Sequence, residues 1–290
     1  MALSIHSDSG DDSVLRHVGA RLLDLAVNAG VLFSLWLGYA FVRQLTADAW
    51  DVALVNSGQM LRIQSWLGLP HEGALQQSVL GWPAAVRAAN TYYMWVHFPL
   101  TGLFVFWTWL RHRHAFGVIR HTLIGVTAVG LVLHVAYPLA PPRFLPGFID
   151  TGQAYGPDPY SISVSDAANQ LAAMPSLHVG WSLIVALSVV ALSARRWRWL
   201  ALAHPAITMA VVVLTGNHYW TDGFVAIGLV LLAWWWATHL AGRPLLRLYD
   251  RPAPDRPAYE FAARAPRTSL PGVAPVDAPS DMISVPATKV

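Results

Sequence analysis

The stretch from Gly216 to Leu240, GNHYWTDGFVAIGLVLLAWWWATHL, points most directly to the fold of this chain. From Trp220 onwards it is apolar for long enough to cross the roughly 30 Å hydrocarbon layer of a bilayer as a helix. Its first residues include His218 and Asp222, which are costly near a membrane unless a site uses them. The stretch therefore predicts a spanning helix with chemistry at one end.

The composition extends this prediction to the whole chain. Hydrophobic residues make up 55% and charged residues 12% of the 290 residues, and 14 are tryptophan, which is unlike a soluble domain. The sequence predicts an all-α polytopic membrane protein with six spans, at 22–42, 92–110, 118–137, 177–194, 200–215 and 220–240. Pro205 interrupts the fifth span, where neighbouring helices can satisfy the freed backbone, and two long helices are the competing interpretation there.

The arginines, which are almost all of the 19 basic residues, predict the orientation. They cluster before the first span, between the second and third, between the fourth and fifth, and after the sixth, as in 111–120 and 195–198. The positive-inside rule then places both termini in the cytoplasm and the candidate site outside, in a multi-pass protein of the plasma membrane. Because these arginines are topology signals, the net charge of +3 does not indicate nucleic-acid binding.

The segments outside the spans predict the domain organisation. A cytoplasmic segment over 1–20 precedes a membrane-embedded domain over 21–242, and a disordered tail rich in proline and alanine follows over 243–290. Residues 44–90 are amphipathic and predict short helices on the outer surface, which cover the site or position the lipid. The N-terminus has no apolar signal-peptide region, and the chain has no cysteine for disulfides or thiolate metal sites.

Two short motifs carry the chemistry. The run Met174-Pro175-Ser176-Leu177-His178 and, about forty residues later, the run 216–222 place two histidines and an aspartate at the edges of apolar helices. Histidine is well suited to attack or protonate a phosphoryl group near neutral pH. Asp222 follows His218 by four residues, so a helix would place both on one face. These motifs predict phosphate chemistry at a membrane surface.

The motifs resemble those of the type-2 phosphatidic acid phosphatase superfamily, with Pro142-Arg143, Pro175-Ser176-Leu177-His178 and His218-xxx-Asp222 as the three signatures. The surrounding residues are more similar to its inositol-phosphoceramide synthase branch of lipid phosphotransferases, through Tyr137-Pro138, Pro141-Pro142-Arg143-Phe144 and Asn217-His218-Tyr219. Two further runs are similar to bacterial members of that branch, Asn90-xx-Tyr93-xxx-His97 and Gly68-Leu69-Pro70-His71-Glu72. The resemblance covers residues 20 to 240 and implies a phosphatidic acid phosphatase/chloroperoxidase-like helical bundle.

The resemblance also implies catalytic roles. His218 would attack phosphorus and form a phosphohistidine, Asp222 would hold its imidazole in the required tautomer, and His178 would protonate the leaving oxygen. No cofactor and no metal are expected, because the scattered histidines show no closed ligand pattern with carboxylates.

Arg143, Ser176 and Asn217 would bind the phosphate. Arg143 offers a planar charged fork, and Pro175 in the first turn of a helix would leave N–H groups of residues 176–178 facing the anion. Arg143 could instead be an interfacial snorkelling residue. The secondary candidates are His97, Tyr137 and His134. His97 and His134 could instead each simply hydrogen-bond a neighbouring helix.

One position departs from the superfamily pattern. The phosphatase form of the third motif has an arginine six residues before its histidine, and this chain has Val212 there. The lysine that usually opens the first motif also has no clear counterpart before Arg143. A lipid phosphodiester carries one negative charge where a monoester carries nearly two, so a single arginine suits a diester better. Backbone N–H groups or Arg87 from the outer loop are alternative donors.

The leading functional prediction is transfer of a phosphoryl-linked, inositol-phosphate-like headgroup between lipids, with phospholipids or polyprenyl phosphates as substrates. The alternative is hydrolysis of a lipid phosphate or polyprenyl (pyro)phosphate, in which water resolves the same phosphohistidine. A third possibility is a non-catalytic transporter or structural membrane protein. A transporter predicts discontinuous helices and paired repeats around a midplane site, and the sequence shows neither.

Overall fold

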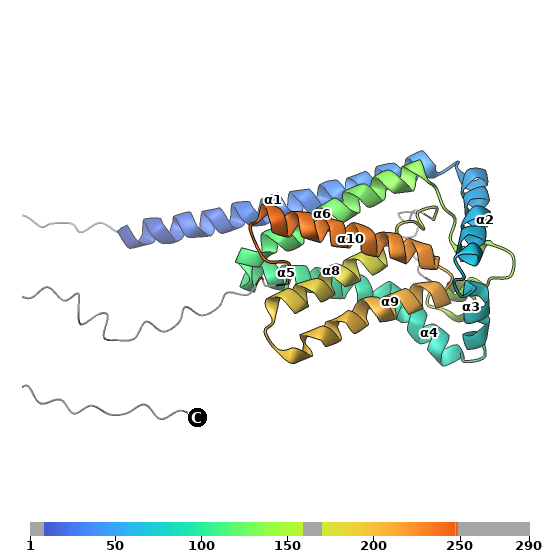
Figure 1. Ribbon diagram of the computed structural model, residues 1–290. Helices are drawn as coiled ribbons and strands as arrows, with labels where there is room; N and C mark the ends of the chain where they lie inside the picture. Colours follow the sequence, from blue (N-terminus) through green and yellow to red (C-terminus); the bar gives the residue numbers. More distant parts are fainter. Residues whose placement is uncertain (1–8, 159–169, 247, 249–290) are drawn as a thin grey trace, which may run out of the picture. The chain divides into compact units, whose positions relative to one another are not determined.

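The computed structural model describes residues 9–158, 170–246 and 248, and within these ranges the chain is helical without strands (Figure 1). A single isolated parallel bridge joins Leu139 to Ala172 in the described part. The all-α prediction is therefore confirmed. Most of the tail predicted over 243–290 lies outside the described residues.

Within the described ranges, four helical segments are long and apolar enough to cross a membrane. They are Val18–Thr46 within α1 (Ser9–Thr46), α6 (Arg113–Ala136), the segment Arg196–Leu214 made by η4 (Arg196–Leu202) and α9 (Ala203–Leu214), and α10 (Trp220–Leu240). Since α1 starts at Ser9, the boundary expected at residue 20 falls inside this helix.

The other two predicted spans form shorter helices. Residues 177–194 give α8 (Leu177–Leu192), which has 16 residues. Residues 92–110 give a π-helical turn, η1 (Tyr92–Val96), followed by the 15-residue α5 (His97–Arg111). The count of six spans therefore stays a prediction, although all six segments are helical. α9 and α10 are separate helices, and Pro205 lies in the first turn of α9, directly after the end of η4.

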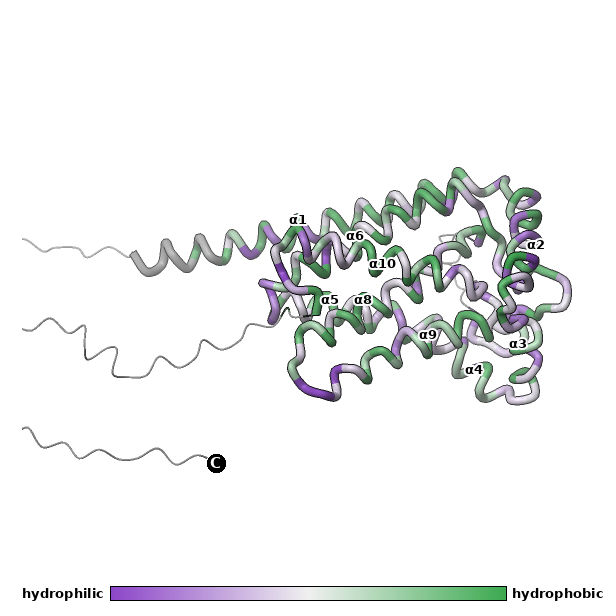
Figure 2. Tube along the Cα trace, viewed as in Figure 1, coloured by the Kyte–Doolittle hydropathy of each residue, from purple (hydrophilic) through white to green (hydrophobic). Residues whose placement is uncertain are grey.

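The apolar core forms where α8 packs against α6, α9 and α10. Its central side chains are buried aliphatic residues such as Ile119, Ile184 and Val230. Figure 2 shows apolar residues along α1 and α9 and a hydrophilic stretch at the turn that joins α8 to α9. In contrast to the core helices, α1 packs chiefly against α6 among the long helices of the described part, and most of its apolar residues stay exposed or partly exposed.

The amphipathic segment 44–90 folds into three short helices, α2 (Trp50–Trp66), α3 (Glu72–Leu80) and α4 (Pro83–Thr91). The connection between α6 and α8 contains the 3-10 turn η2 (Pro142–Phe144) and α7 (Thr151–Tyr155). α3 packs against α9 and α4 packs against α7, so these short helices surround the end of the bundle where the motif residues lie.

Candidate active site

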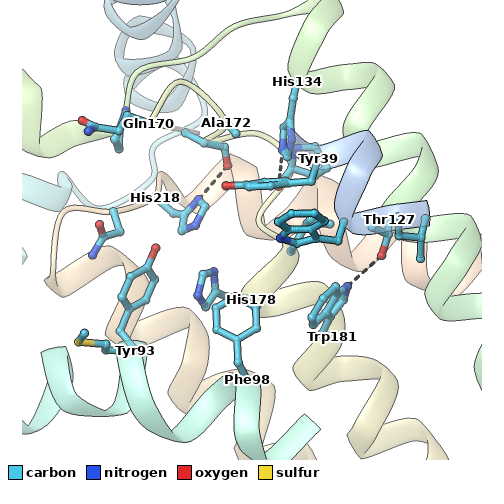
Figure 3. Close-up of a pocket in the computed structure, with 18 of the residues that line it drawn as sticks. Tyr39, Tyr93, Phe98, Thr127, His134, Gln170, Ala172, His178, Trp181 and His218 are labelled. Carbon is cyan, nitrogen blue, oxygen red and sulfur yellow. Dashed lines mark hydrogen bonds between the residues drawn. The ribbon is translucent and has the colours of Figure 1, made fainter. Parts of the chain in front are cut away.

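The three motifs meet at one cavity of about 610 Å³ (Figure 3). Arg143 comes from η2, His178 from the first turn of α8, and His218 from the turn before α10. Pockets that bind small ligands typically have volumes of about 300–1,000 Å³, so this cavity is large enough to bind one. The structure thus brings together residues that lie far apart in the sequence.

The ring of His218 is oriented mainly by a backbone carbonyl. Its Nδ1 lies 2.8 Å from the carbonyl oxygen of Ala173 and 3.4 Å from Oδ2 of Asp222. A proton on Nδ1 therefore donates to Ala173, and the lone pair stays on Nε2, which is the tautomer that a nucleophilic histidine needs. The sequence predicted Asp222 as the partner that fixes this tautomer, but the nearer acceptor is a carbonyl that no side-chain pattern could reveal.

The contact between His218 and Asp222 arises from a helix cap, and the prediction of a shared helix face is wrong. α10 begins at Trp220, so His218 precedes the helix and Asp222 lies in its first turn. The Asp222 carboxylate turns back and accepts the N–H of Tyr219 at 2.8 Å, which brings its Oδ2 to His218. An acidic residue in the first helical turn is also favoured by the helix dipole.

Stacking holds the second histidine, His178, in place. Its ring centroid lies 4.3 Å from that of Tyr93, 4.9 Å from those of His97 and Phe98, and 5.9 Å from that of His218. Its Nε2 has no hydrogen-bond partner among the described residues. The aromatic rings thus fix the plane of His178 beside His218 without using this nitrogen.

The N-terminus of α8 differs from its predicted geometry. Ser176 is the N-cap, so Pro175 precedes the helix instead of occupying its first turn. The Ser176 N–H donates to the carbonyl of Asp222 at 3.1 Å, and its hydroxyl accepts the N–H of Val179 at 3.5 Å. Ser176 does not line the described cavity, whereas Leu177 and His178 do. Their N–H groups, in the first turn, are better placed for an anion.

Arg143 is the only lysine or arginine among the described cavity-lining residues. Its Nη1 donates to the side-chain oxygen of Asn217, and its Nε lies 3.4 Å from Oδ2 of Asp150. The Arg143 N–H donates to the carbonyl of Gly216 at 2.9 Å. Two of the three predicted phosphate ligands, Arg143 and Asn217, therefore lie together at the cavity, and an aspartate offsets part of the arginine charge.

The secondary candidates have different positions. His134 lines the cavity, with Nε2 3.4 Å from the carbonyl of Pro175. His97 is fully buried and contacts the ring of His178, but it does not line the cavity. Tyr137 is also outside the cavity lining, and its hydroxyl donates to the carbonyl of Asn56 at 3.5 Å.

Two other residues considered as charge donors lie elsewhere. Val212 is fully buried in an apolar cluster with Val179 and Met209, so the position that has an arginine in the phosphatases makes a core contact here. Arg87 donates to the carbonyl of Tyr155 at 3.1 Å and is not a cavity-lining residue. The site in the described part therefore contains fewer cations than the phosphatase motif.

The short helices α2 and α3 supply polar contacts that the sequence reasoning missed. Glu72, from α3, accepts the N–H of Trp220 at 3.2 Å, and Gln64, from α2, accepts the N–H of Thr221 at 3.3 Å. Both side chains are buried. They satisfy the first N–H groups of α10, directly beside His218. A polar residue on an amphipathic helix normally faces solvent, so no sequence pattern indicated that Glu72 is buried. Glu72 stands out in the sequence only as part of the run 68–72 that carries the family resemblance.

Tyr219 anchors the same turn. Its hydroxyl donates to the carbonyl of Ala140 at 2.9 Å, and its ring is fully buried. Burial is the largest cause that raises the pKa of Tyr219 above the ordinary value of 10.0, because a phenolate would lose its hydration there. The hydroxyl therefore remains a hydrogen-bond donor at neutral pH, and it ties the segment after α6 to the start of α10.

Comparison with known proteins gives one family match. The family model described as PAP2 superfamily matches residues 58–236, which include all three motifs, the second half of α2, and the whole of α3 and α4. Neither the comparison with curated proteins nor the comparison with solved structures gave a match.

Proposed function

The chain belongs to the PAP2 superfamily, and from this premise we propose that it is an integral-membrane lipid phosphotransferase that works through a phosphohistidine. Membership implies a phosphatase-type or phosphotransferase-type activity on phosphoesters. The observation that supports the finer proposal is the meeting of His178, His218 and Arg143 at one cavity in a chain whose described part has four helices suited to a membrane.

The proposed reaction has two steps. Nε2 of His218 attacks the phosphorus of a phosphodiester lipid, the bond from phosphorus to the lipid oxygen breaks, and His178 gives that oxygen a proton. The headgroup phosphate is then bound to His218. In the second step an acceptor hydroxyl attacks phosphorus, His178 takes its proton, and the bond to His218 breaks. Asp222 stabilises the positive charge that the ring of His218 acquires.

The charge of the site supports a diester substrate. Arg143 is partly offset by Asp150 at 3.4 Å, and the described lining residues contain no second arginine or lysine. A singly charged diester then leaves less uncompensated negative charge in a site of low dielectric constant than a monoester does. We place the protein in the plasma membrane with this site on the extracytoplasmic side, as the arginine distribution indicates.

Rapid quenching with a labelled phosphodiester lipid tests the intermediate. We expect an acid-labile, base-stable adduct that His218→Ala abolishes, whereas His178→Ala still forms it from a lipid with a good leaving group. His239→Ala is the matched control, because His239 lies in the last turn of α10, at the end opposite His218, and should leave the adduct unchanged. Full turnover by His218→Ala would rule out the mechanism.

Product analysis tests transfer against hydrolysis. Mass spectrometry of reactions with and without lipid acceptors should find the headgroup phosphate on the acceptor, and kcat/KM should be higher for a diester lipid than for the matching monoester. A strong monoester preference, with free phosphate as the product, would replace this proposal by the phosphatase function.

A further inference from the structure

The cavity continues well beyond the catalytic residues, along the side of α6. His134, at its polar end, and Leu123, at its far end, both line it. These two residues are separated by 11 positions of one α-helix, which at 1.5 Å per residue corresponds to about 16 Å. That length is about half of a 30 Å hydrocarbon layer, or one leaflet.

One wall of this extension is a single face of α1. Its lining residues are Leu32, Leu35, Trp36 and Tyr39. Their spacing of three, four and seven positions from Leu32 places them on one side of the helix. The side chains of Leu32 and Trp36 are each 54% exposed, so this wall is accessible from the surface where lipid would lie.

The opposite wall comes from η1 and the start of α5. Trp95 and Phe98 line it and are 56% and 47% exposed. Both α1 and α5 pack against α6, so both walls adjoin that helix. The floor between them includes Trp181, whose indole N–H donates to the hydroxyl of Thr127 at 3.2 Å (Figure 3). The polar groups of this pair therefore satisfy each other and leave an apolar floor.

We propose that this groove between α1 and α5 binds one hydrocarbon chain of the substrate, which enters sideways from the leaflet that contains the site. The proposal rests on the proposed function, because it assumes that the phosphoester lies at His178 and His218. The groove joins those residues directly, its walls are apolar, and its length matches one leaflet. A water-soluble phosphoester would gain nothing from such a wall, whereas a lipid keeps its chain in an apolar environment throughout.

Filling the groove tests the proposal. We compare Leu35→Trp with Leu37→Trp, since Leu37 is a 48% exposed residue of the same helix that does not line the cavity. For each variant we measure kcat/KM for a phosphodiester lipid with palmitoyl chains and for bis(4-nitrophenyl) phosphate, which has no chain. Leu35→Trp should lower the ratio of the first value to the second by about tenfold or more, because the added ring occupies space that the chain needs.

The control variant Leu37→Trp should leave this ratio unchanged. The proposal is wrong if both variants change the ratio equally, if neither changes it, or if Leu35→Trp lowers both values in proportion.

A second measurement separates this proposal from the catalytic one. A phospholipid with a diazirine in its acyl chain is photolysed with the His218→Ala protein, and the cross-linked peptides are identified by mass spectrometry. We expect labelling concentrated at 32–39 and 93–98, suppressed by unmodified phospholipid and by Leu35→Trp. Labelling in the groove without any turnover by the unmodified protein would support the groove while refuting the proposed function. Labelling spread evenly over exposed apolar residues such as Leu231 and Leu232 would overturn the groove.

Discussion

Replacement of Gly216 by alanine tests how the turn before His218 positions the phosphate ligands. Gly216 has a φ of 69°, in the left-handed region that glycine adopts readily. A Cβ atom there would lie 3.0 Å from Nε2 of Gln76 and 3.5 Å from the backbone N and the Cβ of Arg143. Alanine at this position must therefore strain the backbone and press on the side chain of Gln76, which hydrogen-bonds Ile149, the neighbour of the Asp150 that pairs with Arg143.

The expected cost follows from these contacts. A left-handed conformation costs a residue with a Cβ about 1–2 kcal/mol. Displacement of Arg143 also weakens its 2.9 Å hydrogen bond to the Gly216 carbonyl, which contributes about 1 kcal/mol. A total of about 2 kcal/mol lowers the unfolding midpoint by about 4–8 °C for a chain of this size. If the displaced Arg143 stabilises the transition state by about 1.4 kcal/mol less, kcat/KM for a diester lipid falls about tenfold.

Thermal unfolding in lipid nanodiscs, followed by tryptophan fluorescence, measures the first effect, and steady-state kinetics with a diester lipid measures the second. Gly228→Ala is the control, because Gly228 lies within α10 and a Cβ there would meet no atom within 4 Å. It should be neutral or stabilise by up to about 1 kcal/mol. A Gly216→Ala protein that melts and turns over like the Gly228→Ala protein would refute this account of the turn.

Three further predictions concern the surroundings of the site. Glu72→Ala leaves the partly buried N–H of Trp220 without its acceptor, so it should cost about 1 kcal/mol and slow adduct formation, whereas Glu72→Gln keeps an acceptor oxygen. Equal effects of the two substitutions in melting and quench experiments would contradict this. Because burial raises the pKa of Tyr219 above 10.0, its contribution to stability is fully present below that pH and is lost as the pH rises further. Tyr219→Phe should therefore reduce the fall of the unfolding midpoint with pH in melts between about pH 9 and 11, and an unchanged fall would exclude Tyr219 as its cause. In the cysteine-free chain, Gln153→Cys should react with an impermeant maleimide in intact cells and Ala194→Cys only after permeabilisation, and the reverse pattern would invert the topology.

The helices and their positions could be predicted from local sequence. The predicted span 220–240 has the same bounds as α10, and the span predicted at 118–137 lies almost entirely in α6. The physical reason is that a backbone surrounded by lipid must satisfy its own hydrogen bonds, so a long apolar run forms a helix whatever its neighbours are. The short motifs were also readable, because ionisable groups at the ends of apolar helices are costly unless they are used.

The catalytic geometry, in contrast, depends on contacts between distant parts of the chain. The Ala173 carbonyl at His218 is 45 residues away in sequence, and the Glu72 carboxylate at Trp220 is 148 residues away. Ser176 matches a motif, yet its hydroxyl caps α8 instead of lining the cavity. Local pattern shows which polar groups are present, but a buried group takes whichever partner the packing brings within about 3 Å, and only the tertiary structure determines that partner.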